Sequence, residues 1–367
     1  MKVSTLVLAL MLSVRAVAQA EAPKPPTQFC VDMQCTSTPA PSTDGVKWHP
    51  GHYMLVFEGD SVDVVLKSRI PEICREPALQ GLQYRIRWHE LETSKNVYSF
   101  REVDDIYAAL KACNKRLVLQ VLAVDFSSTD GTGIVPDYML NNPEYNGGVV
   151  QTTAGYKAKL WESAVMDRLV AVYDALGRRY DAMPNFEGVI VAETAFGGLP
   201  EGYTATAWIE QLKRAIPTIV SAWPKTNVIV FNNFIQASTT EQFVDFVSFL
   251  HSSRVSIGGP DVLPPPHAGS KGERIYRGEI DGLDRRGKMP AAFAVQTPEL
   301  GGKEGSFTPQ QLYDMCVKTN QCGHIFWIRN NYMGGAAQQW DTGILPFIRQ
   351  NPRTVDSCPS RYTSCIR

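Results

Sequence analysis

The sequence predicts an α/β protein, a (β/α)8 TIM barrel that forms a single domain behind an irregular N-terminal lead-in. Three observations predict this fold. Eight short apolar runs recur along the chain, bounded by Gly, Pro and Asn. Several runs show little alternation of apolar and polar residues, which is typical of strands covered on both faces, as in a parallel sheet. Segments with helical periodicity separate the runs, and this alternation favours a parallel β/α fold.

The eight runs are the candidate barrel strands. They cover residues 52–57, 82–88, 116–124, 188–193, 227–231, 255–257, 291–296 and 325–328. An open, doubly wound sheet is the alternative arrangement. A count of eight strands favours closure into a barrel, and no glycine-rich phosphate-binding turn follows the first run.

Four segments between the runs have apolar residues at helical spacing, namely residues 103–113, 164–180, 204–223 and 309–318. The last of these has a good start, because Thr308 suits the N-cap and Pro309 the first helical position. Residues 126–156 are polar and rich in Gly, Asn and Pro, and they follow the third strand. This segment and residues 258–278 after the sixth strand are expected to roof the substrate-binding face of the barrel.

Both ends of the chain are expected to lie outside the catalytic barrel, which covers residues 47–350. Residues 1–20 are interpreted as a signal peptide, with Lys2 as the positive start and an apolar run too short to cross a bilayer. Residues 21–46 are a lead-in rich in Pro, Ser and Thr, and residues 351–367 are a tail tied by a disulfide. The mature protein is therefore expected to be secreted or periplasmic, without insertion into a membrane.

Eight cysteines in an exported chain indicate disulfide bonds. They are Cys30, Cys35, Cys74, Cys113, Cys316, Cys322, Cys358 and Cys365. The connectivity does not follow from the sequence. If close neighbours pair, Cys74 and Cys113 are left to bridge two early helices. A zinc site is the alternative, but the chain has no CxxC pair and His324 lacks a second His beside it.

The composition narrows the function. The chain is 44% hydrophobic and 20% charged, an ordinary globular composition, and its net charge of −1 gives no electrostatic reason to bind nucleic acid or an anionic membrane. Phosphate chemistry would need more Lys and a glycine-rich cradle, and metal hydrolysis would need clustered His and Asp. No cofactor or metal is therefore implied, and a neutral ligand suits the chain better.

Side chains at the carboxyl ends of barrel strands converge on one site. There the sequence offers carboxylates, amides, aromatic rings and a few cations, which together suit the hydroxyls and ring faces of a carbohydrate. The candidate catalytic residues are Glu193 and Glu299. The candidate substrate-binding residues are Arg87, Trp88, His89, Asp125, Asn232, Asn233, Asp261, His267, Trp327 and Asn330.

Glu193 and Glu299 end the fourth and seventh strands, which face each other across the barrel mouth. Cleavage of a glycosidic bond needs two carboxyl groups: one protonates the leaving oxygen, and in the retaining mechanism the other attacks the anomeric carbon. Each of the two could instead cap a helix or pair with Arg. Glu304 is an alternative to Glu299, since the surrounding proline and glycines make the end of the seventh strand hard to place.

Over roughly residues 48–347 the chain resembles the clan A glycoside hydrolases, which are retaining (β/α)8 enzymes. Residues 81–92 read Gly-Leu-Gln-Tyr-Arg-Ile-Arg-Trp-His-Glu-Leu-Glu, and Val-Tyr-Ser-Phe follows at 97–100. This stretch looks like the second-strand region of β-galactosidase-like members.

The resemblance implies that Glu193 is the acid/base and Glu299 the nucleophile. A Trp on the eighth strand is common in the clan, and Trp327 matches it. Ala192 departs from the clan, in which Asn usually precedes the acid/base Glu. Arg87 and Asn232 are expected to orient the reacting groups, and Trp88 and Trp327 are expected to serve as sugar platforms. The sequence thus predicts a retaining, secreted glycoside hydrolase acting on an oligo- or polysaccharide. Alternatives are a non-catalytic carbohydrate-binding barrel and a transglycosylase in exopolysaccharide metabolism.

Overall fold

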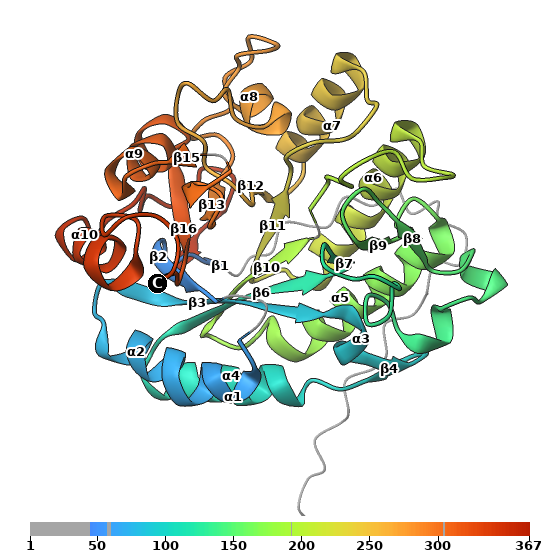
Figure 1. The fold of residues 1–367 in the computed structure, drawn as a ribbon, viewed down its shortest axis with the longest axis horizontal. Helices are drawn as coiled ribbons and strands as arrows, with labels where there is room; N and C mark the ends of the chain where they lie inside the picture. Colours follow the sequence, from blue (N-terminus) through green and yellow to red (C-terminus); the bar gives the residue numbers. More distant parts are fainter. Residues whose placement is uncertain (1–44, 57–59, 192, 304) are drawn as a thin grey trace, which may run out of the picture. The chain divides into compact units, whose positions relative to one another are not determined.

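The computed structural model describes residues 45–56, 60–191, 193–303 and 305–367, and it confirms the (β/α)8 barrel (Figure 1). Eight parallel strands close into one barrel. They are β2 (Gly51–Leu55), β3 (Leu79–Arg87), β6 (Arg116–Leu122), β10 (Phe186–Val191), β11 (Asn227–Phe231), β12 (Ser256–Gly259), β13 (Ala291–Val295) and β16 (Cys322–Ile328). Each of the eight predicted runs overlaps one of these strands, and β16 pairs with β2 to complete the ring.

The predicted helices are confirmed and surround the barrel (Figure 1). They are α4 (Arg101–Ala112), α5 (Ser163–Tyr180), α6 (Ala205–Ala222) and α9 (Pro309–Tyr313), which continues as a π-helical segment (Asp314–Thr319). The α9 start is a capping box: the Thr308 hydroxyl accepts a hydrogen bond from the Gln311 N–H, and the Gln311 side chain accepts one from the Thr308 N–H.

Further helical segments fill the remaining connections. They are α1 (Val62–Val64), a π-helical segment (Val65–Arg69) and α2 (Ile70–Arg75), then α3 (Trp88–Leu91), α7 (Thr240–Ser252), α8 (Lys271–Tyr276), a π-helical segment (Trp340–Ile344) and α10 (Leu345–Gln350). Helix α8 lies inside the predicted loop 258–278. It begins there because the Ser270 hydroxyl accepts a hydrogen bond from the Glu273 N–H.

The segment after the third barrel strand builds a small sheet in the order β7 (Val124–Asp125), β9 (Tyr156–Ala158), β8 (Val149–Gln151). Two 3₁₀ turns (Asp137–Met139 and Pro143–Tyr145) lie between β7 and β8. Figure 1 shows this sheet at the arrowhead ends of β6 and β10. Two-stranded pairs β4 (Glu92–Ser94) with β5 (Val97–Tyr98), and β14 (Leu300–Gly302) with β15 (Gly305–Ser306), also follow barrel strands.

The strands lack alternation because both of their faces are covered. On β10, the Phe186 ring stacks on Tyr180 of α5 and on Trp223, which follows α6. The next residue, Glu187, points the other way, into the barrel, where it contacts β16. Helix packing outside and side chains inside therefore bury every residue of the strand.

The C-terminal tail covers the amino end of the barrel. Its strand β17 (Cys365–Ile366) pairs in parallel with β1 (Val46–Lys47) just before the first barrel strand. Tyr362 packs edge-on against Trp48, and its hydroxyl donates to Asn227 Oδ1 at 3.1 Å. The Arg361 guanidinium donates to backbone carbonyls that lead into β12. Aromatic packing and hydrogen bonds thus hold the tail in addition to its disulfide.

Three disulfides link described residues: Cys74–Cys113, Cys316–Cys322 and Cys358–Cys365. This is the pairing expected if close neighbours join, and the first bridge ties α2 to the end of α4. The described residues hold no cluster of three or more potential metal ligands, and no helix among them is long and apolar enough to span a membrane. The predicted signal peptide, most of the lead-in, Cys30 and Cys35 lie outside the described residues.

A buried carboxylate bridges the barrel interior near its amino end. Glu187 of β10 is fully buried; its Oε2 lies 2.7 Å from His49 Nδ1 and its Oε1 lies 3.2 Å from His324 Nε2 of β16. These two strands lie on opposite sides of the barrel. Burial alone raises the pKa of Glu187, but the hydrogen bonds from His324 and His49 outweigh it and lower this pKa to about 2.

Candidate functional site

A cavity opens at the carboxyl ends of β3, β6, β10 and β13, on the face that was predicted to bind substrate. Its polar walls come from Arg85, Gln120, Lys157, Glu193 and Gln296. Its apolar walls come from Val121, Leu122, Ala123, Val124, Phe126 and Pro260. Among the predicted site residues, Glu193 is the one that lines this cavity.

The carboxylate of Glu193 is held by Asn233, another predicted residue, whose Nδ2 donates to Glu193 Oε1 at 2.6 Å. The amide of Asn233 is fixed from its other end, because its Oδ1 accepts from the N–H groups of Ala195 and Phe234 at 3.1 and 2.8 Å. An oxygen with two backbone donors sets the orientation of the amide, so the amino group must face Glu193. The structure thus brings Glu193 and Asn233 together from the ends of β10 and β11.

Lys157 of β9 lies beneath the same carboxylate. It is 1% exposed, and its ammonium donates to the backbone carbonyls of Glu193, at 3.2 Å, and of Ala195. The ammonium also lies 4.2 Å from the centre of the Phe196 ring. Burial lowers the pKa of Lys157 to about 8, against the opposing charge of Glu193. Lys157 therefore ties the segment that carries Glu193 to the small sheet.

On the other wall, an arginine is surrounded by amides. Arg85 and Gln120 are register partners on β3 and β6, and Arg85 Nε donates to Gln120 Oε1 at 3.2 Å. Arg85 Nη2 donates to Gln296 Oε1 at 3.0 Å. Gln296 directly follows β13, and its Nε2 donates to the Pro260 carbonyl at 2.9 Å. This wall offers two neutral amides and one guanidinium, groups of the kind that bind hydroxyl groups.

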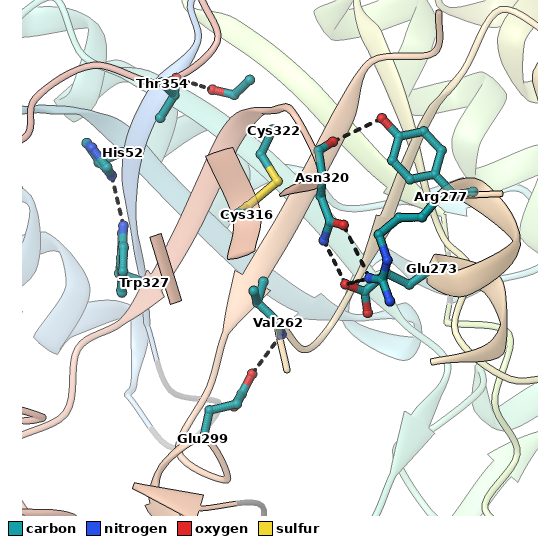
Figure 2. The surroundings of a disulfide bond; sticks show 12 residues. His52, Val262, Glu273, Arg277, Glu299, Cys316, Asn320, Cys322, Trp327 and Thr354 are labelled. Atoms are coloured by element: carbon teal, nitrogen blue, oxygen red, sulfur yellow. Dashed lines mark hydrogen bonds and ion pairs between the residues drawn. A yellow bond between two sulfur atoms is a disulfide. The ribbon is translucent and has the colours of Figure 1, made fainter. Parts of the chain in front are cut away.

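Glu299, the predicted partner carboxylate, is not among the described residues that line the cavity. Figure 2 shows it beside Val262. It is fully buried, its Oε1 accepts from the Val262 N–H at 3.1 Å, and its Oε2 accepts from the Gln296 N–H at 3.0 Å. One oxygen therefore braces the loop after β12, and the other braces the turn that leaves β13. Burial raises the pKa of Glu299 well above its ordinary value, and the charge of Asp261 raises it further. The alternative, Glu304, lies outside the described residues, as does Ala192.

The two predicted sugar platforms, Trp88 and Trp327, are fully buried rings. Trp88 donates from Nε1 to Glu92 Oε2 at 3.1 Å. Trp327 donates from Nε1 to His52 Nδ1 at 2.9 Å, as Figure 2 shows, and it packs edge-on against Phe347. A position at the end of a strand does not show from the sequence whether a ring faces the mouth or packs in the core.

Arg87 and Asp125 satisfy each other beside the cavity. Arg87 Nη2 donates to Asp125 Oδ2 at 2.7 Å, while Asp125 Oδ1 accepts from the N–H and hydroxyl of Ser127 at 2.8 and 2.7 Å. Burial alone raises the pKa of Asp125, but these hydrogen bonds and the charge of Arg87 outweigh it and lower the pKa. The pair therefore orders the start of the insertion.

The five remaining predicted residues are not among the described residues that line the cavity. Asn232 is fully buried beside α8, and Asn330 is fully buried and caps its own turn. The ring of His267 packs against Phe307. His89 lies over Gly133 in the insertion, and Asp261 acts on Glu299. These residues support the loops around the mouth.

Sequence reasoning missed several residues of the cavity. Arg85 and Gln120 lie inside barrel strands, where a polar residue in an apolar run was a usable sign of an interior position near the mouth. Phe126 is 50% exposed and lines the cavity, so it is a candidate surface for a sugar ring. Lys157 comes from the insertion, and only the folded sheet brings it under Glu193.

No family model matches the sequence, and no curated protein matches it either. Solved structures share the fold. The β-amylase catalytic domain from Paenibacillus polymyxa is 8% identical with a TM-score of 0.57, covering 83% of this chain and 98% of that one. Endo-glycoceramidase II from a Rhodococcus species is 12% identical with a TM-score of 0.55, covering 83% and 80%.

A β-galactosidase from Bacillus circulans sp. alkalophilus is 12% identical with a TM-score of 0.56, covering 84% of this chain and 56% of that one. At such low identities these likenesses establish the shared barrel fold. What the cavity does must be argued from its own side chains.

Proposed function

We propose that this chain binds a carbohydrate in the cavity and acts on a glycosidic bond there, with Glu193 as the group that gives a proton to the leaving oxygen. The observation that carries the proposal is the carboxylate of Glu193, which lines the cavity and is held in place by Asn233 at 2.6 Å. A proton donor must be fixed within hydrogen-bond reach of its target, and Asn233 fixes this carboxylate from one side.

The rest of the cavity wall suits a sugar. Gln120, Gln296 and Arg85 offer amide and guanidinium groups for hydroxyls, and Phe126 is a half-exposed ring at the mouth. The structures that share the barrel include proteins named as a β-amylase, an endo-glycoceramidase and a β-galactosidase, which supports a glycoside as the substrate. Export of the chain fits the three disulfides, and a carbohydrate outside the cell is then the natural substrate.

A retaining mechanism with Glu299 as the nucleophile stays a prediction, and the burial of Glu299 weighs against it. Its two carboxylate oxygens already accept backbone hydrogen bonds, so it could reach a sugar only if the turn after β13 opened. A second candidate function is a carbohydrate-binding barrel without turnover, and the burial of Glu299 supports it. Glu193 is the one carboxylate among the described residues that line the cavity.

The test is binding and cleavage across a panel of polysaccharides, oligosaccharides and aryl glycosides. Binding is measured by calorimetry and cleavage by chromatography of the products. We expect Glu193→Gln to keep its affinity for the sugar and to lose about 100-fold or more in cleavage of substrates with a poor leaving group. Glu210→Gln, on the exposed face of α6, is the matched control and should behave as wild type.

The outcomes separate the candidates. Binding without cleavage in the wild type favours the binding barrel. Cleavage that survives Glu193→Gln unchanged contradicts the assignment of the proton donor. Absence of binding to every sugar in the panel contradicts the carbohydrate proposal as a whole.

A further inference from the structure

We infer that Gln296 occupies the place of the second catalytic group, so that the described residues of this site can protonate a glycosidic oxygen but offer no carboxylate to attack the anomeric carbon. The inference rests on the proposed function and concerns the same cavity. The chain would then be a carbohydrate-binding barrel that cleaves ordinary glycosides slowly. An added nucleophile would restore the rate of cleavage.

The placement of Gln296 carries the inference. It is the first residue after β13, and β13 lies three strands from β10 around the barrel, so Gln296 and Glu193 line the cavity from opposite sides. Both side chains are fixed: Arg85 and the Pro260 carbonyl hold the amide, as Asn233 holds the carboxylate. A side chain held in this way stays in the cavity when a ligand enters.

Chemistry distinguishes this amide from a carboxylate. In double displacement, a carboxylate oxygen forms a bond to the anomeric carbon while the bond to the leaving oxygen breaks. The oxygen of Gln296 carries no full charge, and it already accepts a hydrogen bond from the Arg85 guanidinium at 3.0 Å. It can therefore hold a hydroxyl but is a poor nucleophile.

Three other described carboxyl groups follow barrel strands near the mouth, and each interacts with other residues. Glu299 is three residues after Gln296, and its oxygens accept hydrogen bonds from the N–H groups of Val262 and Gln296. Asp125 is paired with Arg87 and with Ser127. The charge of Asp261 acts on Glu299. The same environment would suit a carboxylate at 296, because the Arg85 guanidinium would stabilise its negative charge.

Azide provides the first test, and it needs no variant. A sugar that binds in the panel above is supplied as its 2,4-dinitrophenyl glycoside, with and without sodium azide. Azide nitrogen would bond to the anomeric carbon, and the electron pair of the broken bond would leave with the dinitrophenolate. We expect azide to raise the rate at least 10-fold and to yield a glycosyl azide, because the small anion would supply the negative charge that no described residue supplies beside Gln296.

Gln296→Glu provides the second test. We expect it to raise kcat on the natural glycoside by about 100-fold and to abolish the response to azide. The isosteric change keeps the size of the side chain and its contact with Arg85. Glu299→Gln and Glu304→Gln are controls, and both should leave the azide response of the wild type intact if folding is preserved.

Three results would overturn the inference. One is a wild type that binds the glycan yet gains nothing from azide or from Gln296→Glu. Another is a covalent glycosyl adduct on any carboxylate of the wild type, detected by mass spectrometry of trapped protein. The third is an azide response that appears or grows in Glu304→Gln or Glu299→Gln while circular dichroism shows a folded chain. Failure of every sugar to bind would instead defeat the proposed function, which is a separate outcome.

Discussion

Substitution of Glu187 by Gln should change how the stability of the barrel depends on acid. The pKa of this carboxyl is about 2 in the folded chain and 4.5 when it is exposed in the unfolded chain. Because the folded value is the lower one, the stabilisation is fully present above pH 4.5 and is lost as the pH falls towards 2. The difference corresponds to about 3 kcal/mol at neutral pH, of which about 2 kcal/mol is lost by pH 3.

The assay is urea unfolding of wild type and Glu187→Gln at several values between pH 7 and pH 3. The free energy of unfolding is extrapolated at each pH. Gln destabilises the chain at neutral pH, because His49 and His324 lose their charged partner. We expect this difference to shrink by about 2 kcal/mol at pH 3, while Glu210→Gln runs parallel to wild type. Parallel curves for Glu187→Gln would refute the assignment of acid sensitivity to this carboxyl.

Four further predictions concern the site and the fold. Asn233→Ala should lower kcat about 10-fold with little change in KM, since it removes the donor to Glu193 and leaves the cavity wall intact; steady-state kinetics on a cleaved glycoside decides this. Relative to Lys157→Met, the wild type should gain about 3 kcal/mol of stability between pH 8 and pH 10.5. The pKa of Lys157 is lower in the folded chain than in the unfolded chain, so the unfolded chain keeps the proton to a higher pH; urea unfolding across that range measures the gain in stability. Replacing both Cys74 and Cys113 by Ser should cost about 4 kcal/mol, since the bridge closes a loop of 39 residues, and the midpoint of thermal unfolding should fall accordingly. Gly81→Ala should cost about 3 kcal/mol or prevent folding, because its Cβ would lie 1.9 Å from a backbone carbonyl of β6; circular dichroism and urea unfolding report both outcomes.

The barrel was predictable because its signal is spread over the whole chain. Each buried strand is a short apolar run, and the helices between them repeat an apolar face, so an error at one boundary changes little. Thr308 and Pro309 even marked the start of α9 correctly. Helix α8 was missed because it is short: its six residues, capped by Ser270, contain too few apolar positions to show a helical period.

The site was harder to predict, because position relative to a strand end does not say where a side chain points. Glu193 was predicted at the end of the fourth strand, and the structure places it in the cavity wall with Asn233 as its hydrogen-bond partner, while its catalytic role stays a prediction. After β13, however, Glu299 was predicted as the second catalytic residue because it is a glutamate near the end of the strand. The turn carries Glu299 back into the protein and leaves Gln296 at the cavity, and three residues of loop geometry decide this. The sequence also could not place Lys157, since its contact with the mouth depends on how the insertion folds.

The two glutamates of the β10 segment show how environment assigns a role to a carboxyl group. Glu187 is fully buried and bonded to His49 and His324, so its proton equilibrium is coupled to folding and its charge fastens two sides of the barrel. Glu193, six residues later, has one amide partner and faces a cavity. A carboxyl that is bonded on every side cannot exchange a proton with a ligand without unfolding its surroundings, whereas one held from a single side can do so. Strand β10 therefore carries a structural acid near the amino end of the barrel, and the segment that follows the strand carries Glu193 at the cavity, where Lys157 of the small sheet supports it.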